Sequence, residues 1–259
     1  MSLSRRVVRD LRRDGLRATA SKGLSFIKFQ PPVVHVYTRY YRWKVAQASD
    51  YEHLADPFTL RWLDPLRVKK MSPFEGSAYS NYLGRIMPGK WDMRAEEIKE
   101  YDIYYSILEH FNCGVPWEDT DYYKRVRSIV EEGESKFGCR TINDVDERFQ
   151  DIDLLYTAIR DDGYIPSREL SEETNVISGG VRGNYTGKLI DEIVVDIDRN
   201  GEPLFVEGRH RLAIAASLEL DQIPVLVARR HDQWQSKREN LARRSQSRDI
   251  EHFDLVDIR

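Results

Sequence analysis

The chain of 259 residues has only two cysteines, Cys113 and Cys139. Two cysteines cannot build a disulfide framework or a four-ligand zinc site, so those two classes are excluded and a reducing compartment is the default. The sequence also lacks any run of about 18 apolar residues, which a membrane-spanning helix needs. No apolar block follows the arginines near the N-terminus, unlike in a secretory signal. We therefore expect a cytoplasmic protein, or one held at the inner face of the membrane.

Charge is present but unevenly distributed. The formal net charge is −3, yet residues 1–44 carry +9, residues 45–225 carry −14 and residues 226–259 carry +2. A basic segment attached to an acidic body indicates a surface that meets phosphates or anionic lipid. Hydrophobic residues make up 41% of the chain, which is enough to build a core and argues against global disorder.

Composition and periodicity predict an α/β (α+β) protein in which a mostly helical N-terminal region precedes a small mixed sheet. Four segments are predicted. They are a basic amphipathic and aromatic segment at 1–44, an irregular and then helical region at 45–140, a mixed-sheet domain at 141–232 and a charged tail at 233–259.

Local signals place the elements of the mixed region. Asn143 is a plausible N-cap for a helix that stops at Gly163, and Asn200-Gly201 marks a hairpin turn. Glycines within 178–187 indicate a flexible insertion or lid. The predicted elements are helices at 121–132, 143–162 and 208–218 and strands at 192–198, 203–206 and 223–228, after a helical pattern that begins near residue 95.

The strongest local pattern is the run Glu207-Gly208-Arg209-His210-Arg211, which joins a predicted strand to a predicted helix. A helix N-terminus offers unpaired N–H groups, glycine permits close backbone approach, and arginines supply fork-shaped donors for phosphate oxygens. The run therefore predicts an anion cradle of Gly208, Arg209, His210 and Arg211, beside which Glu207 holds Mg²⁺ or acts as a base. The alternative is a structural helix start whose arginines pair with acids of the body.

Three motifs resemble the ParB/sulfiredoxin-like fold over residues 149–231. Residues 154–163 resemble its "ESIxxxG" helix, residues 205–213 contain its "GxxR" turn, and residues 220–225 contain its "IPV" strand. The whole chain is also similar to prokaryotic proteins that carry a ParB N-terminal-like domain. The resemblance implies that the region at 141–232 folds as a ParB/sulfiredoxin-like domain.

Members of this fold differ in chemistry, and the motif residues separate them. Sulfiredoxins place a cysteine after the motif glycine, where this chain has Arg209, so disulfide reduction is not expected. ParB proteins bind CTP through Gly-Glu-Arg-Arg, and Arg209 and His210 replace the second and third of those residues. Free-serine kinases use an acid followed by Gly-His-His-Arg. Resemblance to them implies that Glu207 is a catalytic acid and that Gly208, His210 and Arg211 grip nucleotide phosphates.

We therefore predict a protein that binds a nucleotide (ATP, ADP or CTP) with Mg²⁺. The predicted activity is that of a kinase, which transfers a phosphoryl group to a small hydroxyl compound, or that of a nucleotidase. Phosphoryl transfer needs mainly positioning and charge neutralisation, which these residue types supply. A second carboxylate is expected beside Glu207. Glu169, Asp196 and Asp198 are its candidates, and the last two share one side of a predicted strand.

Two other classes of function stay open, and both depend on residues 1–44. The first is a non-catalytic DNA- or RNA-binding protein, because the aromatics of 37–43 are interleaved with arginine and can stack on bases. The second is a peripheral membrane or glycan-assembly accessory protein, docked on anionic lipid by a predicted basic amphipathic helix at 3–20.

Overall fold

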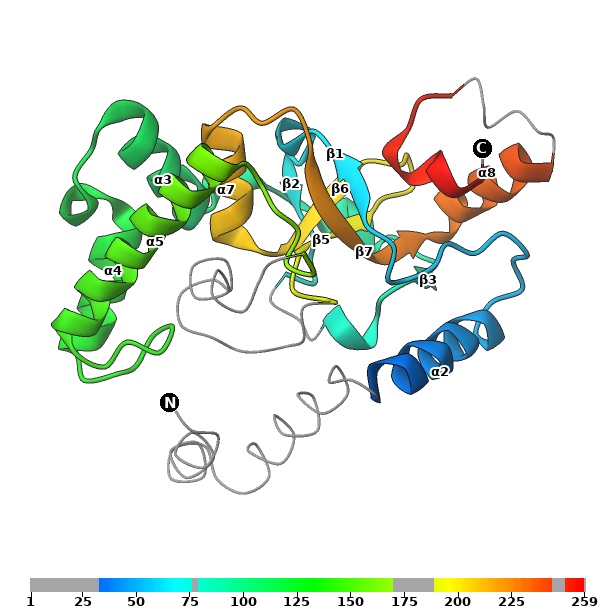
Figure 1. The fold of residues 1–259 in the computed structure, drawn as a ribbon, viewed down its shortest axis with the longest axis horizontal. Coiled ribbons are helices and arrows are strands. Elements are labelled where there is room, and N and C mark those ends of the chain that lie inside the picture. Colours follow the sequence, from blue (N-terminus) through cyan, green and yellow to red (C-terminus); the bar gives the residue numbers. More distant parts are fainter. Residues whose placement is uncertain (1–32, 76–78, 170–188, 244–249, 259) are drawn as a thin grey trace.

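A mixed sheet forms the centre of the molecule in the computed structural model, which describes residues 33–75, 79–169, 189–243 and 250–258 (Figure 1). The strand order is β1-β7-β5-β6-β2-β4, and β3 pairs with the far end of β7. The fold is a mixed α/β fold, as predicted. The strands are β1 (Arg61–Leu63), β2 (Lys70–Met71), β3 (Arg85–Met87), β4 (Glu96–Glu97), β5 (Ile193–Ile197), β6 (Pro203–Glu207) and β7 (Ile223–His231).

The β5–β6 hairpin is antiparallel and turns where the sequence predicts. Gly201 has φ +99°, a backbone conformation that favours glycine. The side chain of Asp198 accepts hydrogen bonds from the N–H groups of Asn200 and Glu202, and so caps this turn. β7 adds to β5 in parallel, and β2 adds to β6 in parallel. The region predicted to be irregular thus supplies β1 to β4 to the same sheet as β5 to β7.

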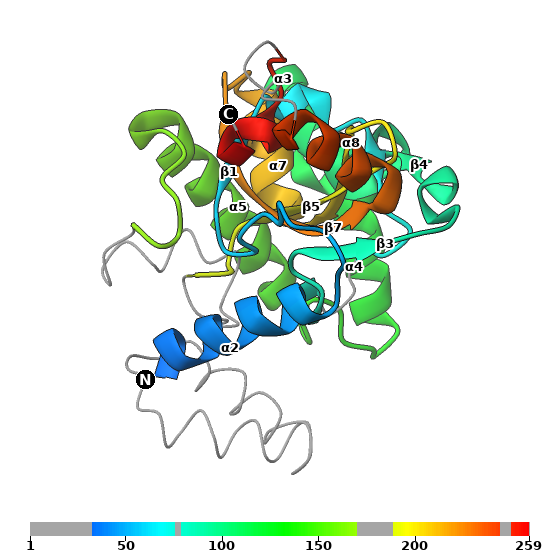
Figure 2. The same cartoon turned by 90° about the vertical axis from the view of Figure 1, so that its right-hand side faces the viewer.

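The two faces of the sheet are covered by different helices (Figures 1 and 2). Successive strand residues point to opposite faces, so Val194 packs with Tyr41 of α2 while Val195 packs with Leu212 of α7. Behind α7, the helices α3, α4 and α5 form a second apolar cluster. The helices are α2 (Val33–Gln47), α3 (Asp102–Cys113), α4 (Asp121–Glu131), α5 (Ile142–Asp162), α7 (Arg209–Ser217) and α8 (Asp232–Arg243).

Several element boundaries differ from the predictions for local reasons. α5 is capped by Thr141 and not by Asn143, because the Thr141 hydroxyl accepts from the Asp144 N–H while the Asp144 carboxylate accepts from the Thr141 N–H. The helical pattern near residue 95 becomes helix α3 only at residue 102, since β4 and a 3-10 turn (Ile98–Glu100) occupy the residues before it. The last strand continues beyond 228 to His231.

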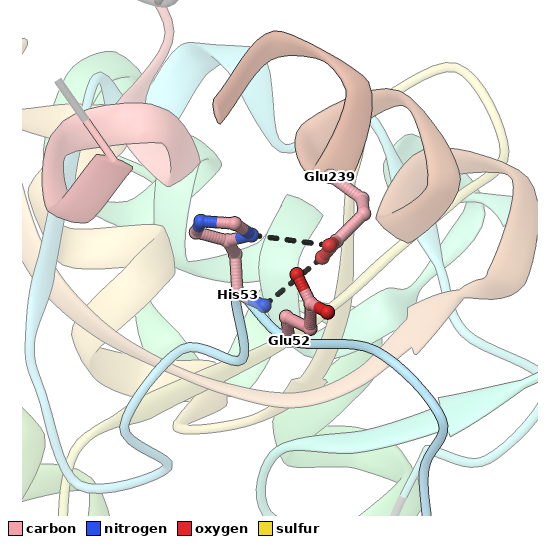
Figure 3. A group of neighbouring side chains, drawn as sticks. All are labelled: Glu52, His53 and Glu239. Atoms are coloured by element: carbon pink, nitrogen blue, oxygen red, sulfur yellow. Dashed lines mark hydrogen bonds and ion pairs between the residues drawn. The ribbon is translucent and has the colours of Figure 1, made fainter. Parts of the chain in front are cut away.

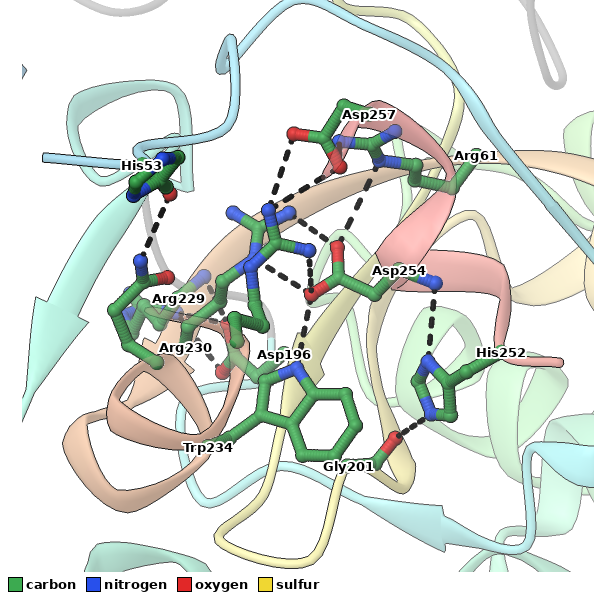
Figure 4. A network of polar contacts seen from close by, with 12 residues as sticks. His53, Arg61, Asp196, Gly201, Arg229, Arg230, Trp234, His252, Asp254 and Asp257 are labelled. Carbon is green, nitrogen blue, oxygen red and sulfur yellow. Dashed lines mark hydrogen bonds and ion pairs between the residues drawn. The ribbon is translucent and has the colours of Figure 1, made fainter. Parts of the chain in front are cut away.

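The C-terminal residues belong to the packed fold where the structure describes them. α8 buries Trp234, and the 3-10 segment η7 (Phe253–Ile258) buries Leu255 in the core beside β1. A buried ionic network joins these parts (Figure 4). In it, three guanidinium groups face two carboxylates, those of Asp254 and Asp257, and the arginines are Arg61 of β1, Arg230 of β7 and Arg238 of α8.

The remaining findings concern single features. Cys113 and Cys139 are both free thiols. Among the described helices, none is long and apolar enough to cross a membrane. The helix predicted at 3–20 and the insertion predicted at 178–187 both lie outside the described residues.

Candidate functional site

Gly208 makes the sharp entry into α7. It has φ +91° and ψ 34°, and it caps the helix without a side chain. A Cβ atom at this position would lie 2.9 Å from the Cα of Ile193 on β5 and 3.1 Å from its Cγ1. Two features of the fold therefore require glycine here, the left-handed conformation and the close approach to a neighbouring strand, whether or not a ligand binds.

We expect Gly208→Ala to lower the free energy of unfolding by about 2 kcal/mol, because the substitution combines a left-handed alanine with a backbone clash. Gly114→Ala is the matched control. Gly114 is also left-handed, with φ +71°, but a Cβ there meets nothing within 4 Å, so its loss is expected to stay near 1 kcal/mol, about the cost of the backbone conformation alone. Equal losses in urea unfolding of the two variants would contradict this account.

Arg211 forms hydrogen bonds with acidic and polar partners within the fold. One guanidinium nitrogen donates to the Ser167 hydroxyl at 3.1 Å and to the Asp191 carbonyl oxygen at 2.8 Å, and the other donates to the Asp191 carboxylate at 2.9 Å. The side chain is buried. This geometry is the one expected of the structural alternative, in which an arginine of the motif pairs with an acid of the body.

His210 is also turned inward. Its Nε2 lies 3.1 Å from the Tyr122 hydroxyl, and that hydroxyl accepts a hydrogen bond from Nε of Arg148, also at 3.1 Å. Burial lowers the pKa of His210 well below its ordinary value, and Arg148, Arg209 and Arg211 lower it further. A neutral, buried imidazole of this kind positions Tyr122 and Arg148 instead of carrying charge to a ligand.

Arg209 is the cation of the motif that remains partly open to solvent, with 20% of its side chain exposed. Its NH2 nitrogen lies 3.6 Å from Oε1 of Glu207 and 3.6 Å from Oε1 of Glu75. Both distances exceed those of a good hydrogen bond. The Tyr101 hydroxyl donates to Glu75 at 3.3 Å. The structure thus brings a second carboxylate, Glu75, to the same guanidinium as Glu207.

Phe137 is surrounded by cations from four different parts of the chain. We call Phe137 with these four residues the Phe137 cluster. The charged ends lie between 4.8 and 5.9 Å from the ring centroid, within the range of cation–π interactions. They belong to Arg125 of α4, the adjacent residue Lys136, Arg148 of α5 and Arg209 of α7.

The backbone and the charge balance of this cluster are both unusual. Phe137 has φ +51°, which is rare for a bulky side chain. Arg125 has a carboxylate partner in Asp102. Arg148 contacts the Tyr122 hydroxyl, the Phe137 carbonyl oxygen and the Phe137 ring, and no carboxylate among the described residues pairs with it. A buried guanidinium that has no carboxylate partner in the described part of the chain raises the local potential and favours an anion there.

The three carboxylates predicted as partners of Glu207 lie elsewhere, and Asp198 caps the β5–β6 turn. Asp196 is fully buried, accepts from the Ser72 hydroxyl at 2.6 Å and pairs with Arg229 at 3.2 Å. Asp196 alternates with Val195 and Ile197 on β5 and therefore faces away from α7. Glu207 follows a bulge in the β5–β6 pairing and lies beside Arg209. Glu169 is exposed, in a turn next to residues outside the described part of the chain. The structure therefore brings none of the three to Glu207.

Glu192, next to Asp191, is a buried carboxyl that no sequence motif marks. It accepts from the Ser167 N–H at 2.6 Å and from the Tyr164 hydroxyl at 3.4 Å, and Arg211 lies at 4.0 Å. Burial raises the pKa of Glu192 from 4.5 to about 7, although Arg211 acts in the opposite direction. The group therefore titrates near neutral pH, on the inner side of α7.

One group of side chains, Glu52, His53 and Glu239, has the composition of a divalent metal site, with donor atoms within 4.8 Å of one another (Figure 3). Each carboxylate oxygen of Glu239 already has a partner, since Oε2 accepts from the His53 backbone N–H and Oε1 lies 3.1 Å from Nδ1 of His53. Arg243 also donates to Glu239 and lies 3.5 Å from Glu52. A cation already compensates these carboxylates, so the group fastens α8 to the segment after α2.

Among the site residues outside the motif at 207–211, one carries a signal in the sequence. Arg148 stands on the inward face of α5, three residues after Val145 and four before Ile152, both of which are core residues. An arginine at such a position is unusual in an amphipathic helix and indicates a buried charge with a structural or functional role. Glu75, Lys136 and Phe137 have no comparable signal, because only the fold brings them near α7.

Comparisons with models of known protein families, with curated proteins and with solved structures found no match to this chain. The resemblance to the ParB/sulfiredoxin-like fold therefore stays a prediction, carried by the sequence motifs. The chemistry gathered at the start of α7 is the remaining indicator of function.

Proposed function

We propose that the chain binds a phosphate compound, a nucleotide with Mg²⁺, at the start of α7. The observation that carries the proposal is the Phe137 cluster, in which Arg148 and Arg209 lie over one ring and Arg148 has no carboxylate partner in the described part of the chain. Charge-assisted hydrogen bonds from guanidinium groups are strong and suit phosphate oxygens.

The proposal assigns different roles to the motif residues than the sequence alone does. Arg209 contacts the phosphates, since its long contacts to Glu75 and Glu207 leave it able to turn toward a ligand. The first N–H groups of α7 contribute the positive end of the helix dipole. His210 and Arg211 hold the site in place from within the fold.

Glu75 and Glu207 are the residues that would hold Mg²⁺. Carboxylates are the protein ligands that Mg²⁺ prefers, and it keeps several waters besides. In a phosphotransfer, Glu207 would accept the proton of the acceptor hydroxyl. The hydroxyl oxygen would bond to the terminal phosphorus as the P–O bond to the rest of the nucleotide breaks. The nucleotide then leaves one phosphoryl group shorter. The phosphotransfer proposal rests on the binding proposal and requires, in addition, that a hydroxyl compound binds beside the nucleotide.

Calorimetric titration with ATP, ADP and CTP, each with and without Mg²⁺, tests the binding. We expect binding at submillimolar to millimolar concentration and about a tenfold weaker affinity for Arg209→Gln, because one charge-assisted contact to phosphate is lost. The variants Glu75→Gln and Glu207→Gln are expected to lose the part of the affinity that depends on Mg²⁺.

Arg67→Gln is the matched control for Arg209→Gln. Arg67 also lies 3.6 Å from a glutamate, Glu202, and over a phenylalanine ring, that of Phe253 at 5.7 Å. The control is expected to bind nucleotide as the wild-type protein does. Absence of binding for all three nucleotides at millimolar concentration, or equal losses for the two arginine variants, would refute the proposal.

A further inference from the structure

The helix α2 has two apolar sides, and the sheet covers only one of them. Tyr41 is buried against the sheet, and Val34, Tyr37 and Val45 pack around it. A second apolar stripe faces away from the core. Its members are spaced four and three residues apart, and all are largely exposed: Val36 at 71%, Tyr40 at 56% and Trp43 at 58%.

Figures 1 and 2 show that α2 lies along one side of the molecule, apart from α3, α4, α5 and α7. The rings of Tyr40 and Trp43 lie next to each other, with centroids 6.0 Å apart. Isolated exposed apolar side chains are common on protein surfaces. A row of them on one helix face, ending in two neighbouring aromatics, is characteristic of a surface that contacts a partner.

The charges of α2 have one sign. The helix contains His35, Arg39, Arg42 and Lys44 and no acidic residue. At 3.6 residues per turn, Arg39 and Lys44 fall on opposite sides of the exposed stripe, and both are exposed. Arg42 instead pairs with Asp56 at 2.8 Å. The chain up to residue 44 has a net charge of +9, whereas the rest of the molecule is acidic.

We infer that the α2 stripe (Val36, Tyr40 and Trp43, between Arg39 and Lys44) docks on an anionic phospholipid surface. Aromatic side chains prefer the boundary between headgroups and acyl chains, where the ring is in an apolar medium and the polar atom stays hydrated. The long cationic side chains on both sides of the stripe reach the lipid phosphates. The helix lies in the plane of the interface and does not cross the membrane.

Lipid fits this stripe better than a nucleic acid does. Bases stack on aromatic rings, and phosphates pair with cations, but neither gives an exposed aliphatic side chain a partner. Val36 is the most exposed member of the stripe, and its apolar surface is buried only by a hydrocarbon medium or by an apolar protein surface. The surrounding positive charge selects the anionic bilayer.

Vesicle co-sedimentation of the 259-residue chain tests the inference. We expect binding to vesicles of phosphatidylcholine mixed with phosphatidylserine, weak binding to pure phosphatidylcholine, and a decrease in binding as salt is raised. The double variant Tyr40→Ser/Trp43→Ser is expected to lose at least about tenfold in partition coefficient, because two ring contacts with the interface are removed.

Trp62→Ser is the matched control, since Trp62 is an exposed tryptophan (44%) on β1. It is expected to bind vesicles as the wild-type protein does, and all variants are expected to keep any nucleotide affinity and the same unfolding curve. Vesicle binding that survives the double substitution would overturn the inference. Absence of binding to the phosphatidylserine vesicles would also overturn it, and RNA binding or dimer formation that the double variant loses would then identify the other occupant of the stripe.

Discussion

Asp254→Asn is expected to cost about 4 kcal/mol of unfolding free energy, a large part of the stability of an ordinary domain. The carboxylate is fully buried and lies within 3.7 Å of the guanidinium groups of Arg61, Arg230 and Arg238 (Figure 4). Without it, Asp257 is the one carboxylate left in this network, among the described residues, to balance three buried cations. The loss is large because a charge left alone in the interior has no water to solvate it.

Urea unfolding followed by tryptophan fluorescence measures this loss, and Trp234 is a local probe because its Nε1–H donates to Asp254 at 2.9 Å. Asp161→Asn is the control, since Asp161 pairs with Arg160 at the surface and is expected to change stability by less than about 0.5 kcal/mol. If Asp254→Asn does not fold, Asp257→Asn tests the same balance with an intermediate loss. A loss below about 1 kcal/mol for Asp254→Asn would contradict this account.

The same cluster predicts instability in acid. Burial alone would raise the pKa of Asp254, but Arg230 and Arg238 outweigh it and hold that pKa well below its ordinary value of 3.8. A carboxyl whose folded pKa is depressed stabilises the fold above the unfolded pKa, and this contribution is lost as the pH falls below it. The contribution of Asp254 is therefore complete above about pH 4 and disappears in stronger acid.

Local signals made the central elements predictable. The β-branched run at 193–197, the Asn200-Gly201 turn and the glycine at 208 each act within a few residues, so one sequence is enough to find them. The buried charges could not be found in this way. Charged residues are normally at the surface, and Arg61 and Asp254 become compatible with the core only because the fold brings together two segments that are far apart in the sequence.

The motif at 207–211 shows the same limit at the candidate site. The residue types predict an anion cradle, but they do not tell which arginine faces solvent. Arg211 is turned inward because Asp191 and Ser167 lie beside it, while Arg209, two residues earlier on α7, points to Glu75 and Phe137. Neighbours supplied by other elements, and not the motif itself, decide which side chain can meet a ligand.

The Glu192 carboxyl is expected to make the protein less stable as the pH rises from 4.5 to 7. Burial raises its pKa from 4.5 to about 7, so the folded state holds a proton that the unfolded state has already released. A carboxyl whose folded pKa is raised contributes stability below the unfolded pKa and loses it as the pH passes the folded pKa. The shift corresponds to about 3 kcal/mol between these limits.

Glu192→Gln copies the protonated form, in which Asp191 is the acidic partner of Arg211 and the amide oxygen can still accept from the Ser167 N–H. We expect the variant to match the wild-type protein at pH 4.5 and to exceed its stability by about 3 kcal/mol at pH 8, with the difference growing between those values. Urea unfolding at several pH values measures it.

Asp161→Asn is again the control, because Arg160 lowers the pKa of that exposed carboxyl and any effect of its titration lies below pH 4. Above pH 5 its difference from the wild-type protein is expected to be flat. A Glu192→Gln variant that is less stable than the wild-type protein at pH 8 would mean that Arg211 needs the Glu192 carboxylate as a second counter-ion. In that case the 4.0 Å approach between the two side chains would be an effective ion pair, and the charge balance behind α7 would include Glu192 as an anion at neutral pH.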